Sequence, residues 1–414
     1  MSRKANRQGS SGKAGEGMRD KGRTAGGPVN DTYIVYVGTY ARADEPGIYV
    51  YELDMGSGEL RLLNTQSGIL NPSYLELDEG HNRLLAVSEA TDESGQLVLY
   101  SIDKDSGGLT EETSASTRGA APCYVQLDET GDFAVVANYF GENIALFSIR
   151  DADDADDADD AGAEVEAGEP QRVHQSHSHA GEARAKSTVL YLEQSISHQG
   201  RSVNEERQQG PHPHSTVIHP SGKYVYVQDL GTDEIVIYKL DTTNKQLVLH
   251  GTVAAKPGSG PRHLVFHPTS RYAYVTNELD STVTAFSVDA ESGLLMHVET
   301  VPTLPQTYMG TSFAADIHIS RDGAFLYASN RGHDSIAVFR IDLQSGRLIG
   351  TGFVSTQGSY PRNFSLTPDG SLMLVANQLG DSIVTYRMNP DTGMPIATGQ
   401  MTAVPRPVCI RFWN

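Results

Sequence analysis

The sequence predicts an all-β protein, a seven-bladed β-propeller of four-stranded antiparallel blades, on three observations. A unit of about 47 residues recurs along the 414-residue chain and has seven recognisable starts. Within each unit, apolar and polar residues alternate at period two between short turn-forming segments, which is the pattern of antiparallel strands. The two ends of the chain carry complementary parts of one unit, as expected for repeats that close into a ring.

The repeat has a constant plan. Each copy starts at a proline, or once an alanine, followed by two variable residues and a short apolar strand. A second strand usually ends in Asn, a third ends in Tyr or Phe, and a weak fourth strand follows an Asp…Gly-Leu-like turn. The seven starts are Pro72, Pro122, Pro213, Pro261, Ala314, Pro361 and Pro407. Because one such meander cannot bury both of its faces alone, we expect seven of them to stack radially around an axis.

The chain ends predict how the ring closes. Residues 33–63 read as a unit that lacks its first strand, and residues 407–414 (PVCIRFWN) read as a first strand that lacks the rest. We expect the two segments to form the last blade together. This pairing of N- and C-terminal strands removes the open edge that a linear array of sheets would leave.

Two segments fall outside the repeat. We predict that residues 1–31 are a disordered tail and that the propeller occupies 32–414. The second and third starts are 91 residues apart, and this interval holds an acidic, His-rich insertion at about 151–205 that includes DADDADDADD, a self-repelling run predicted to be disordered. Its HQSHSH segment (174–179) is interpreted as a loop rather than a metal site. The chain is expected to rejoin its blade as an outer strand near 187–194.

The composition of the chain limits the classes of function that it can have. The formal net charge is −20, half of it between Asp151 and Glu169, which argues against nucleic-acid binding. The two cysteines, Cys123 and Cys409, form no redox or metal motif and fit a reducing cytoplasm. No apolar run is long enough to span a membrane, and the basic N-terminal residues precede no apolar stretch, so we expect no secretory signal and a cytoplasmic location.

The predicted topology places two sets of side chains on one rim of the channel. The first strand of a blade is innermost, and its start lies on the same rim as the end of the second strand. The positions after the repeat's start are Ser73-Tyr74, Cys123-Tyr124, His214-Ser215, Arg262-His263, Ala315-Asp316, Arg362-Asn363 and Val408-Cys409. The ends of the second strands are Thr39-Tyr40, Ser88-Glu89, Asn138-Tyr139, Asp229-Leu230, Asn277-Glu278, Asn330-Arg331 and Asn377-Gln378. The recurrent Asn is interpreted as a structural turn residue, whereas the diversity of the other positions indicates a polar ligand pocket.

The non-repeating charged residues are the candidate catalytic set: His214, Arg262, Glu278 and Arg331. Arg presents a planar fork to anions, and Glu or His can take a proton from water. The candidate substrate-binding residues are His212, His263, Asp229, Asp316 and Arg362. The alternatives are a structural salt-bridge ring for the Arg and Glu residues and a solvated or packing role for His212, which also competes with His214.

No cofactor is expected, and a metal site is possible but is not required by the sequence. His212 and His214 with Asp229, His263 and Glu278 offer nitrogen and oxygen ligands, but two His at i and i+2 of a strand share a face without implying a metal. The chain has no nucleophile elbow, P-loop or dinucleotide fingerprint after a strand.

Several segments, among them GPHPHSTVIHPSG, GPRHLVFHP…VTNELDSTV and ISRDGAFLYASNRGHDSI, resemble the lactonases of the seven-bladed β-propeller type. That family includes bacterial 6-phosphogluconolactonases and fungal muconate cyclases, and the resemblance extends over all seven blades. A His, an Arg, a Glu and a second Arg on the channel rim are the proposed active site of the family. The matching positions are His214, Arg262, Glu278 and Arg331.

The resemblance implies hydrolysis of an anionic sugar lactone, 6-phospho-D-glucono-1,5-lactone, to 6-phosphogluconate, a step of the pentose phosphate pathway. Glu278 or His214 would activate a water molecule, while Arg262 and Arg331 would hold the anionic substrate or the oxyanion of the intermediate. Two other hypotheses stay open: a cycloisomerase that forms a lactone from a muconate, and a non-catalytic propeller that binds a protein.

Overall fold

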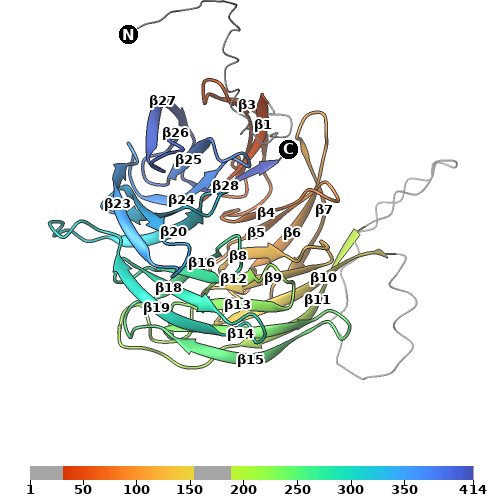
Figure 1. Cartoon of the computed structure of the whole chain (residues 1–414). Helices are drawn as coiled ribbons and strands as arrows, with labels where there is room; N and C mark the ends of the chain where they lie inside the picture. Colours follow the sequence, from red (N-terminus) through yellow and green to blue (C-terminus); the bar gives the residue numbers. More distant parts are fainter. Residues whose placement is uncertain (1–30, 153–187, 414) are drawn as a thin grey trace, which may run out of the picture. The chain divides into compact units, whose positions relative to one another are not determined.

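The computed structural model of the chain describes residues 31–152 and 188–413, and the regular elements in this part are 28 β-strands. They form seven sheets of four antiparallel strands, which confirms the predicted propeller. The sheets follow one another around a ring in chain order (Figure 1). The first strands of neighbouring sheets contact one another around the whole ring, so these strands line the central channel. None of the described segments is a helix with the length and apolar character needed to cross a membrane.

In each sheet the strand named first lies next to the channel. The first three sheets after the N-terminal strands are β4 (Leu75–Asp78), β5 (Arg83–Ser88), β6 (Gln96–Ile102) and β7 (Leu109–Ser116); β8 (Pro122–Leu127), β9 (Phe133–Asn138), β10 (Asn143–Asp151) and β11 (Thr188–Ser197); and β12 (Pro213–Ile218), β13 (Tyr224–Asp229), β14 (Glu234–Asp241) and β15 (Gln246–Ala254). The next three are β16 (Pro261–Phe266), β17 (Tyr272–Asn277), β18 (Thr282–Val288) and β19 (Leu295–Pro302); β20 (Phe313–Ile319), β21 (Phe325–Arg331), β22 (Ser335–Ile341) and β23 (Leu348–Ser355); and β24 (Pro361–Leu366), β25 (Leu372–Asn377), β26 (Ser382–Met388) and β27 (Pro395–Ala403).

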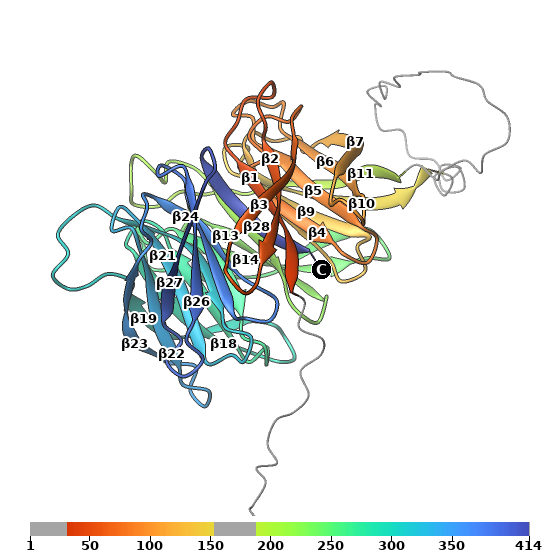
Figure 2. The same cartoon turned by 90° about the horizontal axis from the view of Figure 1, so that it is seen from above.

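The seventh sheet joins both ends of the propeller. Its strands are β28 (Pro407–Trp413), β1 (Thr32–Thr39), β2 (Ile48–Asp54) and β3 (Leu60–Gln66), in that order. β28 pairs antiparallel with β1, with Ile34 opposite Trp413 and Gly38 opposite Cys409. In the view from above, β28 again lies with β1–β3 (Figure 2). The predicted closure is therefore confirmed, and the ring has no open edge between its first and last strands.

Contacts between blades explain the recurrent Asp…Gly turn. The hydroxyl of Tyr36 in β1 donates to the carbonyl of Gly107, which lies in the turn before β7 of the next blade, at 2.9 Å. Tyr274 in β17 donates in the same way to Gly346, before β23, at 3.0 Å. Gly346 has φ +72°, and a Cβ there would lie 2.4 Å from the Tyr272 ring. These glycines therefore permit both the turn and the close approach of the neighbouring blade.

The strand after the insertion is present, but it begins a longer ordered segment than the sequence predicts. β11 covers most of the strand expected near 187–194 and runs on to Ser197. The predicted limit of the disordered insertion, about residue 205, is too late, because 198–205 follow β11 in defined positions, with the His198 amide bonded to the Glu142 carbonyl at 2.9 Å. Because this segment is polar, the sequence does not reveal the turn that it forms. The predicted disorder of the N-terminal tail and of the acidic and HQSHSH runs falls outside the described residues.

We predict that β28 carries a large share of the stability because it closes the ring. Ile410 is completely buried between β1 and the neighbouring blade, so Ile410→Ala is expected to lower the free energy of unfolding by about 2–5 kcal/mol. Ile396 in β27 is 55 % exposed, so the matched variant Ile396→Ala should change it by about 0.5 kcal/mol or less. Urea denaturation measures both values. Equal losses in the two variants would contradict the structural role assigned to β28.

Candidate active site at one mouth of the channel

The two predicted sets of side chains meet on one rim. The antiparallel register places Pro213 opposite Asp229 and Pro261 opposite Asn277, so the start of each first strand adjoins the end of the second. A register shift follows the opening residue in five blades. The residues in these irregularities are Cys123, His214, Arg262, Ala315-Asp316 and Arg362. A bulge turns a side chain away from the strict alternation of a strand, and four of these five sites contribute a residue to the mouth of the channel or to the space just beneath it.

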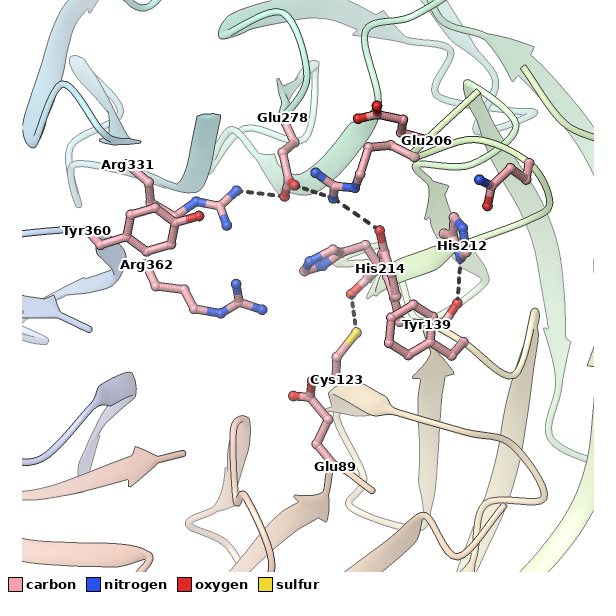
Figure 3. A pocket seen from close by; sticks show the side chains of 13 residues that line it. Glu89, Cys123, Tyr139, Glu206, His212, His214, Glu278, Arg331, Tyr360 and Arg362 are labelled. Atoms are coloured by element: carbon pink, nitrogen blue, oxygen red, sulfur yellow. Dashed lines mark hydrogen bonds and ion pairs between the residues drawn. The ribbon is translucent and has the colours of Figure 1, made fainter. Parts of the chain in front are cut away.

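The rim encloses a cavity of about 540 Å³, within the range of small-molecule sites. Its lining residues are Glu89, Cys123, Tyr139, Phe140, Glu206, Arg207, Gln209, His212, His214, Glu278, Arg331, Tyr360 and Arg362. Figure 3 shows these side chains projecting toward one another. Of the predicted site residues, His212, His214, Glu278, Arg331 and Arg362 therefore lie together.

Glu278 is the centre of a buried ion cluster. One carboxylate oxygen lies 2.7 Å from Arg207 Nη2, and the other lies 2.7 Å from Arg331 Nη2 and 3.0 Å from Arg262 Nε. Burial alone would raise the pKa of Glu278, but the positive charges of Arg331, Arg262 and Arg207 outweigh burial and hold this pKa well below its usual range. A carboxylate so strongly stabilised is a weak base. Its evident role is to hold three guanidinium groups in place.

Arg262 lies beneath the mouth rather than in it. Its side chain is 2 % exposed, and its Nη1 donates to the Ala315 carbonyl at 2.7 Å. It borders a small space deeper in the channel together with His214, His263 and Arg362. Arg262 therefore acts on the site mainly through its charge and through Glu278.

His214 presents a neutral imidazole to the cavity. Burial, reinforced by the charges of Arg262 and its neighbours, lowers the pKa of His214 well below the ordinary value. Its Nδ1 is buried and has no hydrogen-bond partner among the described residues, so this atom can bond to a ligand or a water molecule. His212 differs, because its ring stacks on Tyr139 at a centroid distance of 4.6 Å and its Nδ1 lies 2.9 Å from the Tyr139 carbonyl oxygen.

Arg362 is the cation of the cavity that has no anionic partner within the described residues. Its guanidinium lies over the Tyr40 ring at 5.4 Å and takes part in none of the ion pairs of the described chain. Burial would lower the pKa of Arg362, but the surrounding Tyr40, Glu89 and Glu278 raise it above its ordinary value. Arg362 thus remains charged and available to an anionic ligand.

Three predicted substrate-binding residues, His263, Asp316 and Asp229, lie outside the mouth. His263 Nδ1 lies 2.8 Å from the Asp316 carboxylate, which also faces His318 Nε2 at 3.1 Å. Both His263 and Asp316 border a cavity at the opposite end of the channel. They occupy the second position of their variable pairs, whereas the three pair residues that line the mouth, Cys123, His214 and Arg362, occupy the first position.

Asp229 is fully buried and has a structural environment. Its Oδ1 accepts hydrogen bonds from the amides of His212, Gly231 and Thr232 at 2.8–3.1 Å, and its Oδ2 lies 2.7 Å from His198 Nδ1. Asp229 is predicted to contact the substrate, but its carboxylate is instead used in these structural hydrogen bonds. Its carboxylate holds the start and the end of the 198–212 loop.

Several lining residues were not predicted as site residues. Arg207 and Glu206 belong to the loop after β11, which follows the predicted end of the insertion at about 205 and lies outside the repeat that identified the rim. Glu89, Tyr139 and Cys123 occupy rim positions that the repeat identifies, but no charge pattern in the sequence distinguishes them. Among the described residues, no three His, Cys, Asp or Glu side chains converge as ligands for a metal ion.

Comparisons with known proteins point to one family. A family model described as "Lactonase, 7-bladed beta-propeller" matches residues 34–193 and 182–412. The chain is 32 % identical over 380 residues to the 6-phosphogluconolactonase of Bacillus subtilis, covering 92 % of this chain and 98 % of that protein. It is 30 % identical over 340 residues to a 6-phosphogluconolactonase of Formosa agariphila, covering 80 % and 86 %. The solved structure of a periplasmic gluconolactonase from Pseudomonas aeruginosa superposes with a TM-score of 0.79 at 30 % identity, covering 92 % of this chain and 99 % of that one.

We predict that Glu278→Gln destabilises the protein, because it leaves the charges of buried arginines without their counter-ion. The expected loss in the free energy of unfolding at pH 7 is about 3–5 kcal/mol. Since the folded pKa of Glu278 is depressed, its contribution is complete above the unfolded value of about 4.3 and declines as the pH falls below that value.

The measurement is denaturant unfolding of wild type and variant between pH 7 and pH 3, a range that extends below the unfolded pKa of a glutamate. The difference between the two proteins should shrink toward the acidic end. A difference that is small at pH 7, or that does not change with pH, would contradict the ion cluster.

Proposed function

The chain belongs to the lactonase family of seven-bladed β-propellers, and from this premise we propose that it hydrolyses 6-phospho-D-glucono-1,5-lactone to 6-phosphogluconate. Two relatives with this activity in their names support the proposal. The observation that carries it is the convergence of Arg207, Arg331 and Arg362 on one cavity of a protein whose net charge is −20. Such a cavity suits an anionic substrate.

The chemistry needs little beyond water, an anion site and a proton acceptor. A lactone is an ester in a ring, and attack of water at its carbonyl carbon places negative charge on the carbonyl oxygen. We assign stabilisation of that oxyanion to Arg362, which has no competing anionic partner among the described residues, with the neutral His214 as a hydrogen-bonding neighbour. No cofactor is required for this reaction.

Arg207 is the candidate phosphate ligand at the outer edge of the cavity. Its side chain is 36 % exposed, and its contacts to Glu278 and to the Tyr139 hydroxyl use Nη2 alone. Within the described part of the chain, the N–H groups of Nη1 and Nε therefore remain for an anion arriving from solvent. We place the reaction in the cytoplasm, where the free and buried Cys123 and Cys409 would stay reduced.

An assay with 6-phospho-D-glucono-1,5-lactone, corrected for spontaneous hydrolysis, tests the function directly. Purified protein should accelerate ring opening, and a muconate should not be converted. Absence of turnover with this lactone, or faster conversion of a muconate, would overturn the proposal.

We expect Arg362→Ala to lower kcat/KM by about 10²–10³-fold for phosphorylated and unphosphorylated gluconolactone alike, because the oxyanion forms in both reactions. Arg340 in β22 is exposed and distant from the rim, so Arg340→Ala is the matched control and should leave the rate unchanged. Steady-state kinetics with both lactones gives the comparison. An unchanged kcat/KM in Arg362→Ala would refute the assignment.

Arg207→Ala should act selectively. Loss of one charge-assisted contact to phosphate is worth roughly 10–100-fold in kcat/KM, and we expect this loss for the phosphorylated lactone but a much smaller one for glucono-1,5-lactone. The measured quantity is the ratio of the two kcat/KM values in wild type and variant. A ratio that stays constant would exclude Arg207 as the phosphate ligand.

A further inference from the structure

Three glutamates line the cavity, and Glu206 is the one exposed to solvent. The surroundings of the other two, Glu89 and Glu278, differ. Glu278 is surrounded by three arginines, whereas Glu89, which follows β5, takes part in no ion pair of the described chain and accepts hydrogen bonds from the Tyr40 hydroxyl at 3.2 and 3.3 Å. Figure 3 shows the two glutamates reaching into the cavity from opposite sides, with Arg362 extending between them. Glu89 therefore keeps oxygen lone pairs that are directed at the space where a ligand would lie.

We propose that Glu89 is the general base of the hydrolysis, an assignment that rests on the lactonase function proposed for this site. Glu89 accepts a proton from a water molecule while the water oxygen forms a bond to the lactone carbonyl carbon, and the carbonyl electron pair moves to the oxygen facing Arg362. When the tetrahedral intermediate collapses, the bond from that carbon to the ring oxygen breaks. The ring oxygen takes the proton back from Glu89 and becomes the free hydroxyl. The carboxylic acid that forms then ionises, so one water is consumed and one proton is released.

The backbone holds Glu89 in a fixed position. Its amide donates to the Asn71 carbonyl at 3.2 Å, and the Asn71 side chain donates to the Glu89 carbonyl at 3.2 Å. Tyr40 is anchored in turn by a hydrogen bond from its amide to the Arg406 carbonyl at 3.1 Å, and its ring lies beneath the Arg362 guanidinium. A base used once in every turnover needs such a fixed setting. Tyr40 is the positioning residue of this arrangement.

The charges around Glu89 agree with this role. Burial is the largest influence and raises the pKa of Glu89, while Arg362, the Ser73 and Tyr40 hydroxyls and Arg262 oppose it without cancelling it. Burial also raises the pKa values of Tyr40 and of the Cys123 thiol, so both neighbours stay neutral. The pKa values of Glu89 and Glu278 are thus shifted in opposite directions, so Glu89 takes up a proton more readily than Glu278, which remains ionised.

Glu89→Gln tests the proposal. The variant should lower kcat by about 10²–10⁴-fold with little change in KM. The decline in kcat/KM that the wild type shows as the pH falls through the pKa of Glu89 should disappear from the residual rate. In Tyr40→Phe the carboxylate loses a hydrogen bond that favours its charged form, so this decline should move to higher pH while most of the rate at high pH is kept.

The matched control is Glu76→Gln. Glu76 in β4 is, like Glu89, a partly buried glutamate whose pKa is raised by burial, but it faces Arg411 at the opposite end of the channel. This variant should keep the wild-type kcat and pH profile. If wild type hydrolyses the lactone and Glu89→Gln keeps both its rate and its acidic decline, the base assignment is wrong. If wild type hydrolyses no lactone, the proposed function fails instead. If Glu89→Gln does not fold, an unshifted profile in Tyr40→Phe overturns the assignment.

Discussion

Closure of the ring by pairing between β28 and β1 is the constraint on which the rest of the structure depends. Each first strand packs against the first strands of both neighbouring blades, so seven strand starts are brought to one mouth of the channel. The cavity draws its side chains from blades that are far apart in the sequence: Glu89, His214, Glu278, Arg331 and Arg362 come from five different sheets. No local segment of the chain could assemble this site, and an open array of the same sheets would separate its members.

Concentrating charge at the mouth has a cost that the cluster around Glu278 offsets. Removing several guanidinium groups from water is unfavourable unless an anion and hydrogen-bond acceptors replace the solvent. Glu278 supplies the anion for three of them, and the carbonyls of Ala314 and Ala315 accept further hydrogen bonds from Arg331 and Arg262. A buried network of this kind is weak as a source of stability, but it fixes the directions of the groups that belong to it. Among the described residues, Arg362 lies outside the network and keeps a guanidinium without an anionic partner.

The repeat made the fold and the rim predictable, but it did not settle which way each side chain faces. Strand polarity alone places the variable pairs at the mouth, and this is why His214, Glu278, Arg331 and Arg362 were correctly placed. The register shifts after the opening residues decide that Arg362 faces the mouth whereas Asp316 faces the other end of the channel. A shift of one residue exchanges the two faces of a strand, and composition carries no sign of it. Arg207 was missed for a different reason, since a polar segment next to a low-complexity insertion looks like part of it.

Glu89 and Glu278 occupy the same position of the repeat, directly after the last residue of a second strand, in blades that begin with β4 and β16. The scaffold gives both the same backbone setting, so the difference between them must come from their neighbours. Glu278 has an arginine in its own first strand and another at the end of the next blade's second strand, whereas the corresponding positions around Glu89 hold Ser73 and Tyr139. The same position of the repeat therefore holds a carboxylate paired with arginines in one blade, Glu278, and a less stabilised carboxylate in another, Glu89. In a propeller of repeated sheets, the chemical roles are therefore set by which unlike residues the ring makes adjacent at equivalent positions of the repeat.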